Sequence, residues 1–276
     1  MNKTESSLFD IKGKVIALTG GTGVLGGEIA CSLAEAGAKV AILDIKTELN
    51  EEIKQRLDRS GSHYEVIKCD VLDRNSIEKC LKQILDHFGV VDILINAAGG
   101  NHPKATTSSD MPFFDIPPEA FDWVMKLNLN GSVLPCQIFG KYFADKEMGN
   151  ILNISSMNAF RPLTRIPAYS AAKAAVSNFT QWLAVHMAQE YSSKIRVNAI
   201  APGFFLTDQN RFLLTDEKTG ELTDRGKSII GHTPVGRFGD PGDLIGTILW
   251  LLSPASEFVT GIVVPVDGGF SAYSGV

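Results

Sequence analysis

Three side chains with acid–base chemistry lie within eighteen consecutive residues. Tyr169 and Lys173 belong to the segment YSAAK, and Ser156 precedes the tyrosine by thirteen residues. Residues four apart share one helix face, so an ammonium would lie beside a phenol. A tyrosine titrates near ~10 in water, and a neighbouring cation favours its phenolate. The pair could therefore give a proton to a carbonyl oxygen or take one from an alcohol.

Further polar residues are expected near this pair. Ser156 follows the apolar run NILNIS, where its hydroxyl could hydrogen-bond the same substrate oxygen. Asn128, in KLNLNG, could hold a water that links the lysine to solvent. Asn96 to Gly99, NAAG, follow another apolar run. By spacing alone a Tyr-x-x-x-Lys pair is more often a solvated helix face, so the functional interpretation depends on these neighbours.

A glycine-rich turn offers a place for a phosphate. The segment TGGTGVLGG, residues 19–27, joins the apolar run KVIAL to a segment with helical spacing. Unpaired N–H groups and the helix dipole favour an anion there, and glycine lacks the Cβ that would hold a pyrophosphate away. Gly21, Gly23 and Gly26 match G-x-G-x-x-G. The turn predicts a dinucleotide site, with a purely structural turn as the alternative.

Asp44 indicates which dinucleotide would bind. It ends the second apolar run, near the expected interval after the glycines. A carboxylate there accepts hydrogen bonds from the two ribose hydroxyls and repels a 2′-phosphate. Lys46 nearby would soften that repulsion. The sequence therefore favours NAD, with NADP possible.

Composition excludes several other classes of function. The net charge of −5 gives no footprint for nucleic acid or an anionic membrane. The start MNKTESSLFD lacks the apolar core of a signal peptide, and no apolar run reaches membrane-spanning length. The four cysteines form no C-x-x-C, which favours small core residues in a reduced cytoplasm. No H-E-x-x-H or G-x-S-x-G motif occurs, so no metal is predicted.

The elements that must position these residues alternate along the chain. Strands are expected at KVIAL, KVAIL, YEVIKC, VVDILIN, NILNIS, KIRVNAI and GIVVPVDGG, and a long helix is expected over 168–190. Such alternation predicts one α/β domain over residues 1–276, doubly wound and Rossmann-like, with a seven-stranded parallel sheet and helices on both faces. Segments 99–118 and 203–235 fit poorly, and the second is predicted to be a substrate lid.

With these pieces in place, the chain resembles the short-chain dehydrogenase/reductase family. The resemblance covers nearly the whole length and rests on an ordered set: the glycine turn, CDVLD, NAAG, LNLNG, NISSM, YSAAK and RVNAIAPG. It implies a Rossmann-like fold, a homotetramer and hydride transfer on a nicotinamide.

The resemblance also implies a catalytic tetrad. Tyr169 would be the acid/base and Ser156 would stabilise the reacting oxygen. Lys173 would grip the nicotinamide ribose and tune the tyrosine, and Asn128 would support a proton relay. The cofactor-binding residues that it implies, together with their neighbours, are Gly20, Thr22, Gly23, Val24, Leu25, Asp44, Asp70, Val71, Asn96, Ala97, Gly99, Tyr169, Lys173, Pro202, Gly203 and Thr207.

One position departs from the family pattern T-G-x-x-x-G-x-G. Val24 stands where the second glycine is usual, and Gly23 comes one place early. A valine does not readily take a positive φ. The special turn conformation is therefore expected either to fall at Gly23 or to be absent at position 24.

The substrate is less sharply indicated. The stretch AAGGNHP resembles a subgroup of fructuronate (mannonate) oxidoreductases. The expected substrate contacts are Ser156, Tyr169, His102 and Asn158, with further candidates Asn101, Lys104, Arg161, Arg165 and Arg211. The phenylalanines of MPFFD and GFF could wall an apolar pocket or pack the lid.

Three functions follow from these features. The leading hypothesis is an NAD(H)-dependent oxidoreductase that interconverts a hydroxyl and a ketone on a sugar acid such as D-mannonate/D-fructuronate. The first alternative is a 3-oxoacyl thioester reductase or general carbonyl reductase using NADP(H). The second is a cofactor-binding protein without catalysis. The small-residue face of SNFTQWLAVHMAQ and the last strand are the expected subunit contacts.

Overall fold

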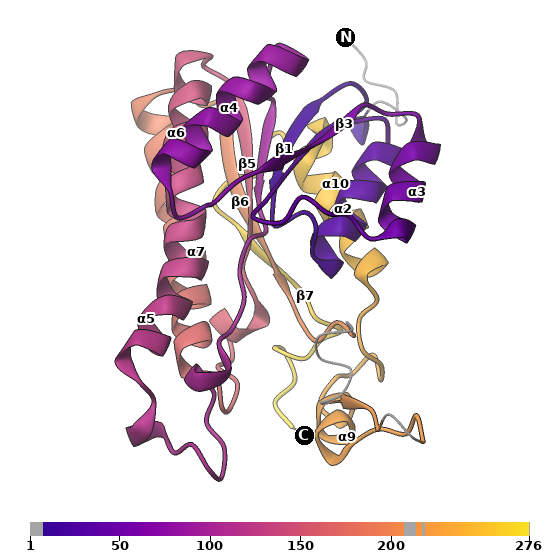
Figure 1. Cartoon of the computed structure of the whole chain (residues 1–276), viewed down its shortest axis with the longest axis vertical. Helices are drawn as coiled ribbons and strands as arrows, with labels where there is room; N and C mark the ends of the chain where they lie inside the picture. Colours follow the sequence, from indigo (N-terminus) through magenta and orange to yellow (C-terminus); the bar gives the residue numbers. More distant parts are fainter. Residues whose placement is uncertain (1–7, 207–213, 217–218, 276) are drawn as a thin grey trace.

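A seven-stranded sheet forms the centre of the molecule (Figure 1). The computed structural model describes residues 8–206, 214–216 and 219–275. The strands lie in the order β3-β2-β1-β4-β5-β6-β7, and every neighbouring pair is parallel. They are β1 (Val15–Thr19), β2 (Lys39–Asp44), β3 (Tyr64–Lys68), β4 (Ile93–Asn96), β5 (Gly149–Ile154), β6 (Ile195–Pro202) and β7 (Val263–Val266). The predicted fold class is confirmed.

Helices cover both faces of the sheet, as Figure 1 shows. One core cluster joins the sheet to α4 (Arg74–Phe88), α6 (Gly131–Asp145) and α7 (Pro167–Glu190). The other joins it to α2 (Val24–Glu35), α3 (Glu51–Ser60) and α10 (Ile245–Leu252). Two further helices are α5 (Pro118–Met125) and α9 (Asp224–Gly231). None of the helices that the structure describes is long and apolar enough to cross a bilayer.

Local sequence signals set several helix boundaries. Helix α3 starts at Glu51, because the Asn50 side chain accepts a hydrogen bond from the Ile53 N–H and caps the first turn. It ends where Gly61 takes a left-handed conformation. Gly89 ends α4 in the same way, as its position after the helical pattern predicts.

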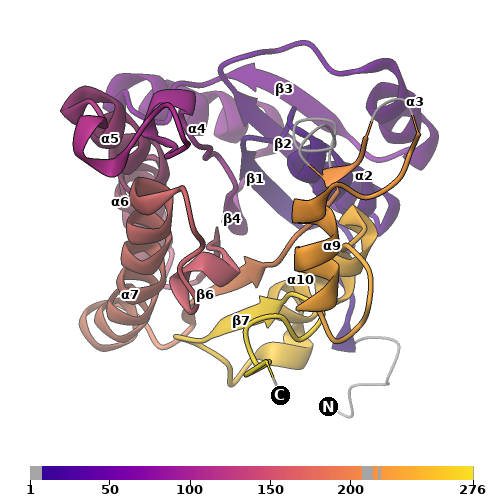
Figure 2. The same cartoon turned by 90° about the horizontal axis from the view of Figure 1, so that it is seen from below.

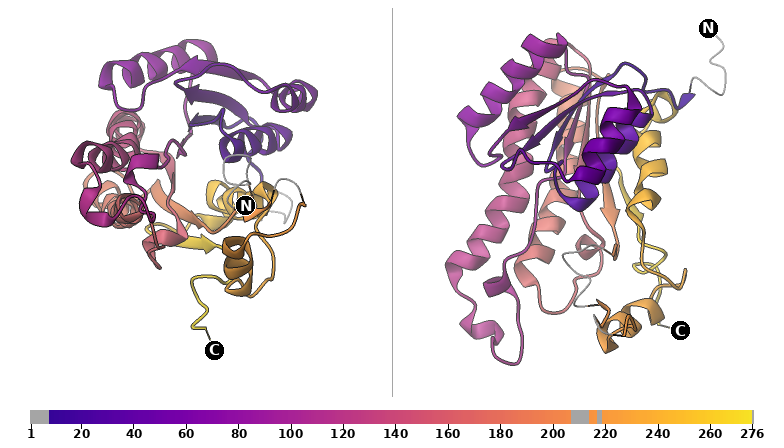
Figure 3. Two further views of the ribbon diagram at one scale, coloured as in Figure 1. Left: turned by 60° about the horizontal axis from the view of Figure 1, so that its bottom comes forward. Right: turned by 45° about the vertical axis from the view of Figure 1, so that its right-hand side comes forward.

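The carboxyl ends of all seven strands meet at one edge of the sheet, because the strands are parallel. Figure 2 views the molecule from this edge, and both views of Figure 3 show α9 and the C-terminal segment beyond it. The irregular segment after β4 holds two single turns, η1 (Pro103–Ala105) and η2 (Phe113–Asp115). A third, η4 (Met157–Ala159), lies between β5 and α7. The residues with predicted chemistry therefore gather around this edge.

Candidate active site

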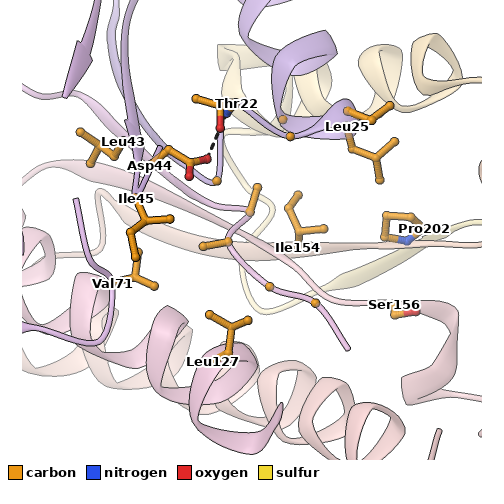
Figure 4. Close-up of a pocket in the computed structure, with 18 of the residues that line it drawn as sticks. Thr22, Leu25, Leu43, Asp44, Ile45, Val71, Leu127, Ile154, Ser156 and Pro202 are labelled. Atoms are coloured by element: carbon orange, nitrogen blue, oxygen red, sulfur yellow. Dashed lines mark hydrogen bonds between the residues drawn. The ribbon is translucent and has the colours of Figure 1, made fainter. Parts of the chain in front are cut away.

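A cavity of about 660 Å³ opens at the carboxyl edge of the sheet (Figure 4). The glycine turn after β1 and the end of β2 form one part of its wall. The segments after β3, β4, β5 and β6 form the rest, together with Leu127 and with Tyr169 and Lys173 of α7. The volume lies in the range of cofactor and ligand sites.

Most of the predicted cofactor residues line this cavity. Those in its wall are Gly20, Thr22, Gly23, Val24, Leu25, Asp44, Asp70, Val71, Ala97, Gly99, Tyr169, Lys173, Pro202 and Gly203. Asn96 is absent from the wall. Thr207 lies outside the described residues.

The glycine turn takes its special conformation at Gly20, which has φ +69°. Gly23 has φ −73° and an extended backbone, and Val24 is the first residue of α2. The expectation of a special conformation at Gly23 was therefore wrong, and no positive φ occurs at position 24. The close approach is at Gly26, where a Cβ would lie 2.1 Å from the Gly20 carbonyl oxygen. Gly26 thus allows α2 to begin tightly against the turn.

Asp44 is held between the turn and its own strand end. One carboxylate oxygen accepts from the Thr22 N–H at 3.1 Å, shown dashed in Figure 4, and the other accepts from the Lys46 N–H at 3.2 Å. The carboxylate also lines the cavity. A glycine cradle at a helix start, with a fixed carboxylate on the neighbouring strand, fits the phosphates and ribose of a dinucleotide.

Asn96 lies beneath the cavity. It is 1% exposed, and its side-chain amide donates to Asn153 Oδ1 at 2.8 Å and to Cys136 Sγ at 3.2 Å. Asn153 in turn donates to Thr180 Oγ1 at 2.9 Å. The chain of side chains joins β4 and β5 to α6 and α7. The geometry thus gives Asn96 a supporting position in place of the predicted cofactor contact.

Lys173 is fixed by the end of β5. Its ammonium donates to the Ile154 carbonyl at 2.8 Å and lies 5.6 Å from the centre of the Tyr169 ring. Lys173 is buried, and Tyr169 is partly buried. Ser156 is buried at the start of η4, where its hydroxyl accepts from the Asn158 N–H at 3.3 Å. The structure thus brings the serine, tyrosine and lysine together in one cavity wall.

Burial dominates the acid–base properties of this group. It raises the pKa of the Tyr169 phenol, and hydrogen bonding with the Ser156 hydroxyl acts in the opposite direction. Burial also lowers the pKa of the Lys173 ammonium to about 8. We expected the lysine to lower the pKa of Tyr169. The pKa is instead raised, because burial outweighs the other effects. The ammonium is itself desolvated and donates its hydrogen bond to Ile154.

Asn128 lies in a π-helical turn, Lys126–Asn130, between α5 and α6. Its side chain accepts from the Gly100 N–H at 3.2 Å and donates to the Gly100 carbonyl at 2.7 Å and the Val124 carbonyl at 2.8 Å. A Cβ on Gly99 would lie 2.7 Å from Asn128 Oδ1 and 3.4 Å from Lys173 Nζ. Asn128 therefore clamps the segment after β4 beside the lysine.

Two predicted substrate contacts lie apart from this cavity. The His102 ring nitrogen Nδ1 accepts from the Lys104 N–H at 3.1 Å, and the ring packs edge-on against Trp123. Asn158 Oδ1 accepts from the Leu163 N–H at 3.2 Å, and the residue lines a separate hollow of about 520 Å³ with Arg165. Neither residue is in the wall of the larger cavity.

The other candidate substrate contacts are exposed, bind neighbouring residues or lie outside the described residues. Asn101 donates to Thr106 Oγ1 at 2.9 Å, and Arg161 donates to the Ser271 carbonyl at 3.2 Å. Lys104 is exposed in η1. Arg211 lies outside the described residues. In the described ranges, no three His, Cys, Asp or Glu side chains gather closely enough to hold a metal ion.

Several wall residues were missed from the sequence. Most neighbour predicted ones along the chain, and Phe204 and Phe205 belong to GFF, for which an apolar wall was one expectation. Leu127 carried no signal, because its place depends on how the π-helical turn packs. The missed residues are Leu43, Ile45, Cys69, Ala98, Gly100, Leu127, Ile154, Ser155, Phe204 and Phe205.

Comparison with known proteins gives consistent matches over nearly the whole chain. A family model described as "Enoyl-(Acyl carrier protein) reductase" matches residues 22–271. "Uncharacterized oxidoreductase UxuB" of Bacillus subtilis is 48% identical over 97% of this chain and 98% of its own length. "2-dehydro-3-deoxy-D-gluconate 5-dehydrogenase" of Escherichia coli is 34% identical over 96% of this chain and 98% of its own length.

Solved structures agree with these matches. A proposed D-mannonate oxidoreductase from Haemophilus influenzae with bound NAD has a TM-score of 0.89 and 46% identity, and covers 97% of this chain and 98% of its own. A gluconate 5-dehydrogenase from Burkholderia cenocepacia in complex with NADP and tartrate has a TM-score of 0.83 and 28% identity, over 96% and 98% of the two chains.

Proposed function

Because the chain belongs to the short-chain dehydrogenase/reductase family, we propose that it interconverts a hydroxyl and a ketone on a sugar acid, with D-mannonate/D-fructuronate as the substrate pair. The chain is an NAD(P)-dependent oxidoreductase. The observation that carries the proposal is the placement of Ser156, Tyr169 and Lys173 in the wall of the cavity that also holds the glycine turn.

The bound nicotinamide supplies or accepts the hydride, and this chain's residues manage the proton. Ser156 binds the reacting oxygen of the substrate. Tyr169 gives that oxygen a proton during ketone reduction and removes one during alcohol oxidation. Lys173 opposes the burial cost of a phenolate once the site is loaded, because its ammonium lies beside the ring. Asn128 holds the segment after β4 in place next to Lys173.

The dinucleotide is held by the glycine turn, and Asp44 favours NAD. Its two oxygens are fixed by the Thr22 and Lys46 N–H groups. A 2′-phosphate would meet this charge, whereas two ribose hydroxyls would donate to it. The NAD bound in the Haemophilus influenzae relative supports this choice, and the NADP in the Burkholderia cenocepacia relative supports NADP as a second cofactor.

The relatives support the sugar-acid class. A deoxygluconate dehydrogenase, a gluconate dehydrogenase and a proposed mannonate oxidoreductase match nearly the full chain. We further propose that segment 203–235, of which residues 207–213 and 217–218 lie outside the described residues, closes over the substrate. We also propose that the chain assembles as a homotetramer and that it works in the cytoplasm.

The test is a panel assay that follows the absorbance of the reduced nicotinamide. Aldonates, hexuronates, neutral polyols, simple ketones and 3-oxoacyl thioesters are each offered with both cofactors. The proposal expects turnover confined to the sugar acids, with NAD(H) preferred. Turnover of acyl thioesters with NADPH alone would establish the alternative reductase function.

A further inference from the structure

Two arginines, neither of them in the wall of the larger cavity, have no acidic partner in the described part of the chain, and one of them, Arg165, is exposed in the separate hollow that Asn158 also lines. Arg165 lies in the segment that joins η4 to α7, four residues before Tyr169, and Arg225 lies in the first turn of α9. Among the described residues, the ion pairs of the molecule involve neither of them. Arg225 is partly buried, and a guanidinium that has lost water needs a compensating anion.

The packing of α9 places the helix face that carries Arg225 against the segment between β5 and α7. Ile229 is four residues after Arg225 and so shares its helix face. Ile229 belongs to a buried cluster with Met157, and Leu163 packs against that cluster. Met157 directly follows Ser156. The face of α9 that carries Arg225 is therefore docked on the segment between β5 and α7.

Arg165 is held in an unusual backbone conformation. Its φ is +76°, one of two positive values at non-glycine residues in the described part of the chain. Its carbonyl accepts from the Thr107 N–H at 2.8 Å, which ties it to the segment after β4. Strain of this kind is concentrated at functional sites and must be offset elsewhere. The backbone that presents this side chain is thus held at its carbonyl by the segment after β4.

The two side chains influence each other. Burial and the charge of Arg165 lower the pKa of Arg225. Two guanidinium groups in one electrostatic environment repel each other, and an anion bound between them would reverse that cost. Figures 1 and 2 show that α9 and the segment between β5 and α7 both lie beyond the carboxyl edge of the sheet, where substrate must enter.

We propose that Arg165 and Arg225 form the subsite for the substrate carboxylate. This inference rests on the proposed function, because a sugar acid carries its carboxylate several carbons from the reacting hydroxyl. Arginine suits the task, since its planar fork binds both carboxylate oxygens. Arg165 comes from the segment between β5 and α7 and Arg225 comes from α9, so the carboxylate would bridge these two elements.

The test compares Arg165→Gln, Arg225→Gln and the double variant with the wild type. The control is Arg59→Gln on α3, which removes the same charge from an exposed side chain that donates to Gln55. KM and kcat are measured for an aldonate and for a neutral polyol of similar length. Each subsite variant should raise KM for the aldonate about ten- to a hundredfold, the scale of a lost charge-assisted hydrogen bond. The kcat for the aldonate and both constants for the polyol should change little.

Other outcomes separate this inference from the proposed function. Unchanged aldonate KM in both subsite variants would overturn the subsite and leave the function standing. An equal rise in KM for the polyol would overturn it too, because the residues would then only shape the pocket. If the wild type turned over neither substrate, calorimetric titration of D-gluconate into the NADH-loaded enzyme would decide. Binding that is weakened by R165Q and R225Q but not by R59Q supports the subsite, and affinity that these changes leave unaltered, or no binding, rejects it.

Discussion

Removal of the Tyr169 hydroxyl should affect the proposed proton transfer and leave cofactor binding nearly unchanged. Tyr169→Phe keeps the ring against its neighbours and removes the proton that the proposed reaction needs. We expect kcat/KM to fall by about 10² to 10⁴, the usual scale of general acid–base catalysis. The Kd for NADH, measured by fluorescence titration, should stay within about threefold of the wild-type value. Turnover within tenfold of wild type would assign the acid/base role to another group.

Lys173 makes stability depend on pH in a defined direction. Burial lowers its pKa from 10.5 to about 8, so between these values the unfolded chain holds a proton that the folded chain has released. The Lys173 contribution to the free energy of unfolding therefore rises with pH across this window, and the burial penalty is fully present below it. Lys173→Met removes that penalty.

The expected result is a stability difference that shrinks with pH. Relative to wild type, Lys173→Met should be most favoured near about pH 7 and should lose on the order of 2 kcal/mol of that advantage by about pH 9.5. Urea unfolding of both proteins at several pH values gives the difference, in which all other titrating groups cancel. A difference that is independent of pH would show that the lysine has an ordinary pKa.

In the proposed function, Asp44 determines which of the two dinucleotides is preferred. Asp44→Asn keeps an acceptor for the Thr22 N–H and removes the negative charge. We expect the ratio of kcat/KM for NADH over NADPH to fall at least about tenfold, because a charge-assisted hydrogen bond is lost and a repulsion is relieved. Thermal unfolding of the cofactor-free variant checks that the turn is intact. An unchanged ratio would transfer the selectivity to Lys46 or another residue.

For single residues, the sequence predicted which residues lie at the site better than it predicted what each side chain contacts there. The placement of Asp44, Tyr169 and Lys173 at one edge follows from strand ends and helix spacing, which local patterns reveal. Asn96 ends a strand just as Asp44 does, yet its side chain turns into the core network with Asn153. Which way a strand-end side chain points depends on the neighbouring strands, and no local pattern records that.

At the scale of elements, the close packing between the turn after β1 and the start of α2 requires that residue 26 has no Cβ. Gly26→Ala would place a Cβ 2.1 Å from the Gly20 carbonyl oxygen, so α2 or the turn must move. We expect the Kd for NADH to rise at least about tenfold and the protein to lose roughly 1–3 kcal/mol of stability, the usual cost of overpacking. Titration and urea unfolding measure the two effects.

Gly246→Ala in α10 is the matched control. No atom lies within 4 Å of a Cβ built at that position. Alanine should therefore stabilise the helix by up to about 1 kcal/mol and leave NADH binding unchanged. If both variants bound NADH like the wild type, the tight start of α2 would not shape the phosphate site.

The element pattern was predictable where hydrophobic periodicity is strong. Apolar runs indicate the buried strands, and terminal glycines indicate where helices such as α4 end. The π-helical turn at Lys126–Asn130 does not, because its extra residue is stabilised by the contacts of Asn128 with Gly100 and Val124. The packing of α9 on the segment between β5 and α7, through Ile229 and Met157, is likewise a product of tertiary structure.

Viewed as a whole, the molecule leaves a large apolar face on the outside of α7. Trp182 is 57% exposed and Val185 is 56% exposed. The Trp182 ring stacks on His186 with centres 4.7 Å apart and on Phe179 with centres 6.3 Å apart. Contiguous apolar surface of this kind marks contact sites, and closed symmetric assembly buries such a face against its own copy. The homotetramer implied by the family resemblance would use this face.

Trp182→Glu tests that assembly. The carboxylate would be buried against a like charge across a twofold contact, so we expect the tetramer to dissociate to smaller species at micromolar concentration. Size-exclusion chromatography with light scattering gives the mass, which for the wild type should be four times the 29.8 kDa chain. Phe9→Ser, which alters an exposed side chain before β1, should leave the mass unchanged. A wild-type mass of one chain would reject the tetramer, and a tetramer that survives the Trp182 change would place the contact elsewhere, for example along the edge strand β7.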